Sequence, residues 1–292
     1  MKKTTTIATL FTGLIVFTLH SCQEDQQKGI SINEEEIAQE AIEDFENYRL
    51  KLNLVDSHYL EFPSPVELAS NYKNSGIEYI PGITNPMDNF ERYHTHTKKS
   101  LNFGVYSADL SYCVLNDQGQ CASDYISALQ TLSERIGLSE IFRYEVVAAQ
   151  FNQSLGDKDS MTKLVRGIQQ DLDKTLRQNG TQDRAILFYT GAWVESAYIA
   201  FSAKSNFSNS LDSASLSQIT MQLEMLTQLN EELSRIGAVN SEVEELQNRM
   251  MEFEELAGQM QITSTGDSVV INAMDLKKLQ DKIFELRSFI VS

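Results

Sequence analysis

The stretch DRAILFYTGAWVESAYIAFSA, residues 183–203, decides the fold class that we expect for this chain. Between Arg184 and Lys204 its only charged residue is Glu195, and most of the other residues are apolar or small. A run of this kind is typical of a helix that is buried on all sides within a larger helical protein. Because Glu195 interrupts it, the run does not offer the roughly 18 consecutive apolar residues of a transmembrane helix.

The segments around this stretch are helical in pattern as well. The chain has only four prolines in 292 residues and is rich in Leu, Glu, Gln and Ala, which favours helices over a turn-rich β architecture. A capping-box pattern at Ser64 to Glu67 predicts the start of one helix. Further helices are expected at residues 87–116, 120–136, 139–154, 158–178, 183–203, 215–236, 241–260 and 275–290. We therefore expect an all-α protein, a multi-helix bundle.

Two segments allow other structure. Residues 261–272 carry strand-forming residues on both sides of Gly266 and Asp267, which predicts a small β-hairpin near the C-terminus. Residues 215–236 keep leucines at 3–4 spacing with Asn230 in the seam, a pattern that fits either a coiled-coil dimer or a helix packed within its own chain. Three heptads are few for a coiled coil, so the intramolecular bundle is favoured.

Two segments of the chain resemble each other. GVYSADLSY at 104–112 and GAWVESAY at 191–198 each contain a glycine, one acid and a tyrosine three residues after the acid. Each precedes a Leu-rich helix that ends in Arg-Ile-Gly, so repeats can be drawn over 87–137 and 184–237. Two copies of one helical hairpin would pack as a pseudo-twofold bundle; chance similarity between amphipathic helices is the alternative.

The acids of these two segments are the candidates for chemistry. Asp109 is the only charged residue between Lys99 and Asp117, and Glu195 stands equally alone in its helix. A carboxylate is expensive to bury unless it is protonated, paired or hydrogen-bonded. Tyrosines lie three residues from each acid and so share its helix face: Tyr106 and Tyr112 for Asp109, and Tyr198 for Glu195.

Two interpretations of this pattern are open. The acids can line a polar pocket that binds a ligand or, as an alternative function, serve a hydrolase as its acid/base pair. The residues of such a pocket would be Asp109, Glu195, Tyr106, Tyr112, Tyr198 and Trp193. Otherwise both acids are structural and are satisfied by tyrosine hydroxyls, helix N-termini or a basic side chain, the interpretation that we favour. Burial distinguishes them, since catalytic acids must meet a cleft that solvent reaches.

Other function classes lack their sequence signals. The chain has no Gly-x-Ser-x-Gly elbow, no phosphate-binding glycine loop and no Cys-x-x-Cys motif, so we expect no cofactor and no catalytic residues of these types. His94 and His96 are two residues apart and would point in different directions on a helix, so no metal site is expected. The formal net charge is −17, and it becomes −19 once residues 1–21 with their two lysines are removed. Such a charge argues against nucleic acid as a partner.

Cys113 and Cys121 form an even pair. On one unbroken helix their eight-residue separation would span about 12 Å, more than a disulfide permits. Residues 116–119 read as a turn, and two helices that reverse there would bring the cysteines face to face. Either a disulfide or two buried thiols is compatible with the sequence.

The first residues predict where the protein is located in the cell. Lys2 and Lys3, an apolar segment from Ile7 to Leu19, and then Cys22 have the pattern of a bacterial lipoprotein signal. We expect a signal peptide at 1–21, a lipidated Cys22 with a flexible tether over 22–33, and a single helical domain over 34–292. The expected location is the outer membrane, reached through lipid on Cys22, on its periplasmic or surface side; ordinary secretion is the alternative.

Three segments also carry a family resemblance. FPSPVELA, NFGVYSADLSY and GAWVESAYIAF resemble segments of a family of exported lipoproteins from Bacteroidota. The resemblance covers most of residues 60–240 and implies an all-helical fold, without an established activity. The acidic run after Cys22 also resembles the surface-export signal of some Bacteroidota lipoproteins. The expectation is a non-catalytic binding or scaffolding component, whose partner is an envelope protein or a small ligand.

Overall fold

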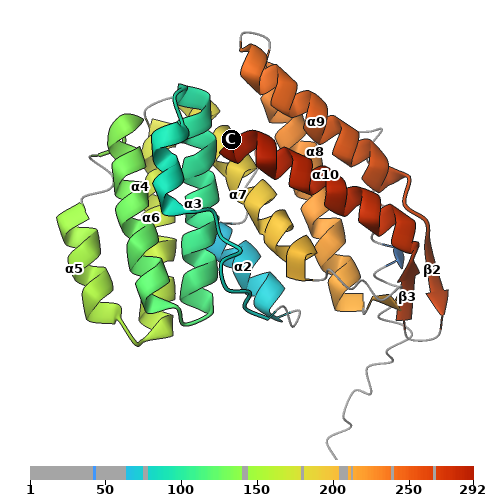
Figure 1. Cartoon of the computed structure of the whole chain (residues 1–292), viewed down its shortest axis with the longest axis horizontal. Helices are drawn as coiled ribbons and strands as arrows, with labels where there is room; N and C mark the ends of the chain where they lie inside the picture. Colours follow the sequence, from blue (N-terminus) through green and yellow to red (C-terminus); the bar gives the residue numbers. More distant parts are fainter. Residues whose placement is uncertain are drawn as a thin grey trace, which may run out of the picture. The chain divides into compact units, whose positions relative to one another are not determined.

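Helices make up nearly all of the structure (Figure 1). The computed structural model describes residues 42–43, 64–74, 78–139, 144–178, 181–203, 210–211, 213–237, 240–265 and 268–292. All of them belong to one compact unit, Asn33–Ser292. Its helices are α2 (Pro65–Asn74), the 3-10 helix η1 (Met87–Arg92), α3 (His96–Leu115), α4 (Gly119–Arg135), α5 (Tyr144–Ser154), α6 (Lys158–Gln178), α7 (Gln182–Ala203), α8 (Ser213–Gly237), α9 (Ser241–Gly258) and α10 (Ala273–Val291). The protein is an all-α multi-helix bundle, as its sequence predicts.

Side-chain caps set several of the helix starts. At α2 the backbone N–H of Ser64 donates to Glu67 Oε2 over 2.8 Å, and Glu67 N–H donates to Ser64 Oγ over 3.3 Å, the predicted capping box. The prediction of one helix over 87–116 is wrong. Thr95 is extended and its hydroxyl accepts from Lys98 N–H, so α3 begins at His96 and the preceding turn is the separate helix η1.

Helices α3 and α7 pack with their backbones in contact. A Cβ atom on Gly104 of α3 would lie 1.9 Å from the carbonyl oxygen of Phe188, and one on Gly191 of α7 would lie 1.9 Å from that of Leu101. Only glycine permits so close an approach. Each contact falls three residues before the other glycine, so the two contacts are reciprocal.

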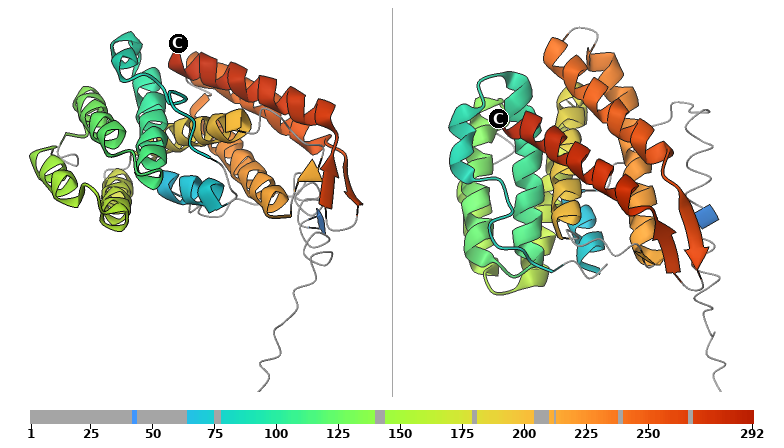
Figure 2. Two further views of the ribbon diagram at one scale, coloured as in Figure 1. Left: turned by 60° about the horizontal axis from the view of Figure 1, so that its bottom comes forward. Right: turned by 45° about the vertical axis from the view of Figure 1, so that its right-hand side comes forward.

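The remaining helices pack around this pair. Helix α4 packs on α3, while α8 and α10 each pack on both α7 and α9 (Figure 2).

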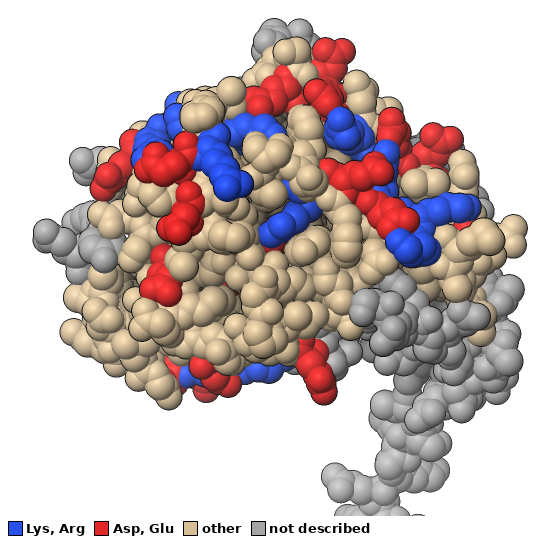
Figure 3. All heavy atoms as spheres, viewed as in Figure 1, with Lys and Arg blue, Asp and Glu red and all other residues tan. Residues whose placement is uncertain are grey.

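Among the described residues no helix is long and apolar enough to cross a membrane. On the face drawn in Figure 3, acidic and basic side chains are interleaved in the upper part of the view, and the lower left part is largely uncharged.

A small sheet joins the C-terminal helices. Strands β2 (Ile262–Thr265) and β3 (Ser268–Ile271) are antiparallel, which confirms the predicted β-hairpin. A third strand, β1 (Ser210–Leu211), pairs with the other edge of β3 in the order β1-β3-β2. Strand β1 has no sequence signal, because two residues in a polar segment show no alternation.

The two cysteines are joined. Cys113 at the end of α3 and Cys121 at the start of α4 form a disulfide, with Cα atoms 5.9 Å apart. Asp117 between them has a positive φ of 58°, which is how the chain reverses at the predicted turn. The predicted signal peptide at 1–21, the lipidated Cys22 and the tether over 22–33 lie outside the residues that the structure describes.

Candidate functional site

The two predicted acids meet inside the bundle. Asp109 of α3 and Glu195 of α7 are both 0% exposed, and each carboxyl group lies close enough to the other to shift its pKa. Arg287 of α10 binds Glu195 from the other side, with Nε 3.0 Å from Oε2 and Nη2 3.1 Å from Oε1. This two-pronged geometry is the strong form of an arginine–carboxylate pair.

We infer that the two carboxyl groups hold one proton between them and that it resides on Asp109. Burial, and after it the charge of Glu195, raises the pKa of Asp109 well above its usual range. Burial also raises the pKa of Glu195, but the Arg287 guanidinium opposes this and favours the ionised form. Asp109 Oδ1 accepts no hydrogen bond from any described donor, and we infer that it carries the proton towards Glu195. The cluster then holds one negative and one positive charge.

Arg287 is the member that sequence reasoning missed. Burial lowers its pKa, but Glu195 outweighs this and holds the pKa above its usual range. The guanidinium carbon lies 4.3 Å from the ring centre of Tyr198, a cation–π contact, so this predicted tyrosine touches the cluster through the arginine. A signal was present, since Arg287 lies seven residues after the buried Gln280 and both flank the apolar stripe of α10.

The other tyrosines hold the segment that precedes η1. Tyr112 Oη accepts from the backbone N–H of Ile80 over 2.7 Å. Tyr106 Oη donates to the carbonyl of Pro86 over 3.0 Å, and Tyr125 Oη donates to that of Asn85 over 2.7 Å. These phenols therefore satisfy backbone groups of an irregular segment in which Asn85 is fully buried.

Asn85 connects this segment to the acids. Its backbone N–H donates to Asp109 Oδ2 over 3.1 Å, and its side-chain amide donates to Tyr93 Oη over 2.8 Å. Asn85 is 0% exposed, so the hydrogen-bonded network is closed around it. Sequence patterns gave no reason to single it out.

Trp193 lies apart from the acids. Its indole N–H donates to the carbonyl of Gln222 on α8 over 2.9 Å, and its ring meets Phe253 of α9 edge-on. No contact joins it to Asp109 or Glu195 among those that the structure describes. The six residues named from the sequence thus divide into a carboxyl pair with Tyr198 nearby, two tyrosines that bind backbone, and a separate tryptophan.

The complete burial of Asp109 and Glu195 argues against the hydrolase alternative. An acid/base pair must exchange protons with a substrate and with water. Both carboxyl groups are 0% exposed, and Glu195 is already paired with Arg287. By the criterion set out above, this arrangement favours the structural interpretation of the acids.

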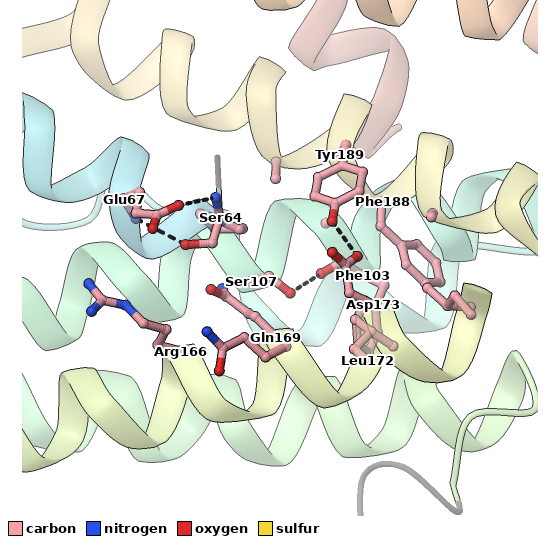
Figure 4. A pocket seen from close by; sticks show the side chains of 16 residues that line it. Ser64, Glu67, Phe103, Ser107, Arg166, Gln169, Leu172, Asp173, Phe188 and Tyr189 are labelled. Carbon is pink, nitrogen blue, oxygen red and sulfur yellow. Dashed lines mark hydrogen bonds between the residues drawn. The ribbon is translucent and has the colours of Figure 1, made fainter. Parts of the chain in front are cut away.

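A separate cleft opens elsewhere on the same helices. It has a volume of about 290 Å³ and lies between the first turn of α2, the middle of α3, and α6 and α7 (Figure 4). Its lining includes Ser64, Glu67, Phe103, Gly104, Ser107, Arg166, Gln169, Gln170, Leu172, Asp173, Leu176, Ala185, Phe188, Tyr189 and Ala192. The volume is at the lower end for small-molecule sites.

One polar group of the cleft has no partner. Both amide atoms of Gln169 are buried, and neither forms a hydrogen bond with the described part of the chain. An unpaired buried amide costs free energy, which a ligand that pairs with it would recover. Gln169 has no distinguishing sequence signal, because a glutamine beside the apolar stripe of an amphipathic helix is ordinarily solvated.

Neither metal-binding side chains nor similarity to known proteins indicates a further site. No group of three or more His, Cys, Asp or Glu side chains in the described ranges is placed to hold a metal ion. Comparison of the chain with known protein families, curated proteins and solved structures found no match.

Proposed function

We propose that this chain is a lipid-anchored protein of the outer membrane that binds a small ligand in the cleft between α3, α6 and α7, without catalysing its conversion. The resemblance to exported lipoproteins of Bacteroidota supports the location, as does the signal pattern that ends at Cys22. The observation that carries the binding role is the cleft itself, with the unpaired buried amide of Gln169 in its wall.

The sealed acids support a role without catalysis. Asp109 and Glu195 were the strongest candidates for acid–base work, and they are occupied by each other and by Arg287. A buried pair of this kind fixes the packing of three helices, α3, α7 and α10. In this proposal the cluster stabilises the scaffold, and the cleft binds the ligand.

The binding role is tested by filling the cleft. Ala185 is partly exposed on its wall, so Ala185→Phe adds bulk there, while Ala200→Phe adds the same bulk to α7 outside the lining. Small molecules extracted from native envelopes are offered to each protein, and bound species are read by native mass spectrometry. We expect ligands bound to the wild type and to Ala200→Phe but lost from Ala185→Phe. Equal binding by all three proteins, or by none, would refute the role.

The anchor is tested at Cys22. Cys22→Ala should move the protein from the membrane fraction to the soluble fraction and abolish metabolic labelling with fatty acid, because the thiol is the site of lipid attachment. Cys113→Ala serves as the control for loss of a cysteine elsewhere. Fatty-acid labelling that persists in Cys22→Ala would contradict lipidation at this residue.

A further inference from the structure

The cleft has an apolar floor made by two aromatic rings. Phe103 of α3 and Phe188 of α7 are 1% and 6% exposed, and their ring centres lie 4.9 Å apart. Leu172 and Leu176 of α6 continue this surface. The floor would bury an apolar group, which contributes through the area that it removes from water.

Most polar groups of the cleft are already engaged. Ser64 and Glu67 bond each other at the start of α2, and Ser107 Oγ donates to the carbonyl of Phe103 over 2.8 Å. Tyr189 Oη donates to Asp173 Oδ1 (Figure 4). Among the buried polar atoms of the lining, the carbonyl oxygen and the amino group of Gln169 find no partner in the described chain.

The charges of the cleft favour a neutral ligand. Glu67 and Asp173 contribute two carboxyl groups to its lining and Arg166 contributes one guanidinium group. A carboxylate ligand would meet two like charges against the single guanidinium of Arg166, and an ammonium ligand would have to displace partners that Glu67 and Asp173 already hold. A neutral molecule avoids both costs.

The geometry of the donor and acceptor in the Gln169 amide restricts the class of ligand further. A side-chain carboxamide presents its carbonyl oxygen and one N–H side by side, so it can accept one hydrogen bond and donate another to the same partner. A ring that contains a cis amide offers the matching N–H and C=O on one edge. The trans amide of a linear peptide presents them on opposite sides and can meet only one.

Resting on the function proposed above, we propose that the cleft binds a neutral cyclic amide with a small apolar substituent. The amide edge pairs with Gln169, and the substituent packs on Phe103 and Phe188. Cyclic dipeptides and other lactams belong to this class, and the cleft volume of about 290 Å³ limits the ligand to a small ring with short side chains.

The test uses four probes, measured by isothermal titration calorimetry on the full chain. Cyclo(Leu-Ala) carries the whole pattern, its N,N′-dimethyl derivative lacks the N–H donors, cyclo(Gly-Gly) lacks the apolar group, and linear Leu-Ala has a trans amide and two charges. We expect the first to bind at least about tenfold more tightly than each of the others, since one hydrogen bond and its desolvation are worth about that factor. Equal binding of the parent and its dimethyl derivative would overturn the proposal.

Two variants test whether the preference for cyclo(Leu-Ala) over its dimethyl derivative depends on Gln169. Gln169→Met keeps the length of the side chain but removes the amide, and Gln170→Met makes the same change at the neighbouring, exposed position of the lining. Gln169→Met should lose the distinction between cyclo(Leu-Ala) and its dimethyl derivative, whereas Gln170→Met should keep it. A preference that survives Gln169→Met refutes the assignment, and circular dichroism verifies that both variants are folded.

Failure of this inference is separable from failure of the proposed function. If envelope extracts yield ligands that Ala185→Phe loses, yet cyclo(Leu-Ala) does not bind, then the ligand class is wrong and the binding role stands. If neither binds to the wild type, both proposals fail.

Discussion

Replacing Asp109 by asparagine should make the protein more stable relative to the wild type as the pH rises. In the wild type, burial and the charge of Glu195 raise the pKa of Asp109, so the folded protein keeps a proton there that the unfolded chain releases above about pH 4. Asparagine is neutral at every pH. It retains an acceptor for Asn85 N–H and supplies an N–H donor towards Glu195, as the protonated acid does.

The expected magnitude follows from the linkage between protonation and folding. A group whose pKa is raised in the folded state contributes stability that is present below its unfolded pKa and is lost as the pH rises through its folded pKa. While folded Asp109 stays protonated and the unfolded side chain is ionised, each pH unit removes about 1.4 kcal/mol from the free energy of unfolding of the wild type. Asp109→Asn lacks this loss, so the difference between the two proteins should change with that slope.

The measurement is urea denaturation at pH 5, 6, 7 and 8, followed by the far-ultraviolet circular dichroism of the helices. Other titrating groups are common to both proteins and largely cancel in the difference. A difference that is constant across this range would show that Asp109 is already ionised in the folded protein, and the shared proton would then be wrong.

Glu195→Gln provides the contrasting change in the same cluster. It leaves Arg287, whose side chain is only 15% exposed, without the carboxylate that binds it through two hydrogen bonds. Breaking a buried ion pair by removing one partner typically costs about 3–5 kcal/mol. We therefore expect Glu195→Gln to be much less stable than Asp109→Asn at pH 7. If the two variants were equally stable, the assignment of the charge to Glu195 would be refuted.

Three further predictions concern the scaffold. Gly104→Ala and Gly191→Ala should each lower the free energy of unfolding by at least about 1–3 kcal/mol, because the new Cβ meets a backbone carbonyl. Gly167→Ala, where a Cβ has open space, should raise it by about 0.5–1 kcal/mol. Thermal melts compare the three variants, and equal effects would contradict the close contact of α3 and α7. Mature protein should show no alkylation of Cys113 or Cys121 before reduction, and replacing both by serine should cost about 2–3 kcal/mol in urea denaturation; free thiols in unreduced material would contradict the pairing. Tyr125→Phe should cost about 1–3 kcal/mol, because the buried carbonyl of Asn85 loses its donor, and an unchanged melting temperature would argue against that bond.

The fold class was predictable from the sequence because helical periodicity is a local property. The apolar run at 183–203 became α7, and the reversal at 116–119 brought Cys113 to Cys121. The break before α3 was missed, since residues 87–95 have helical composition and only the cap at Thr95 ends the pattern. Strand β1 was missed because pairing with β3 is a tertiary event.

The candidate site was predictable only in part. A lone acid in an apolar helix is a strong signal, and both Asp109 and Glu195 proved to be buried and in contact. Their partners came from distant parts of the chain: Arg287 from the last helix, and Asn85 from a segment without periodicity. The cleft depends on how α2, α3, α6 and α7 diverge, which no local pattern records.

The acid cluster also shows how a third helix can distinguish two acids that lie close together. The reciprocal contacts of Gly104 and Gly191 bring corresponding parts of the two segments together, so Asp109 and Glu195 approach each other closely. Two neighbouring carboxyl groups cannot both be buried in the ionised form. If their surroundings were the same, neither acid would be favoured as the ionised one. Arg287 comes from α10, and its hydrogen bonds within the described part of the chain go to Glu195. We therefore assign the charge to Glu195 on α7 and the proton to Asp109 on α3, because the hydrogen bonds of Arg287 favour the ionised form of Glu195.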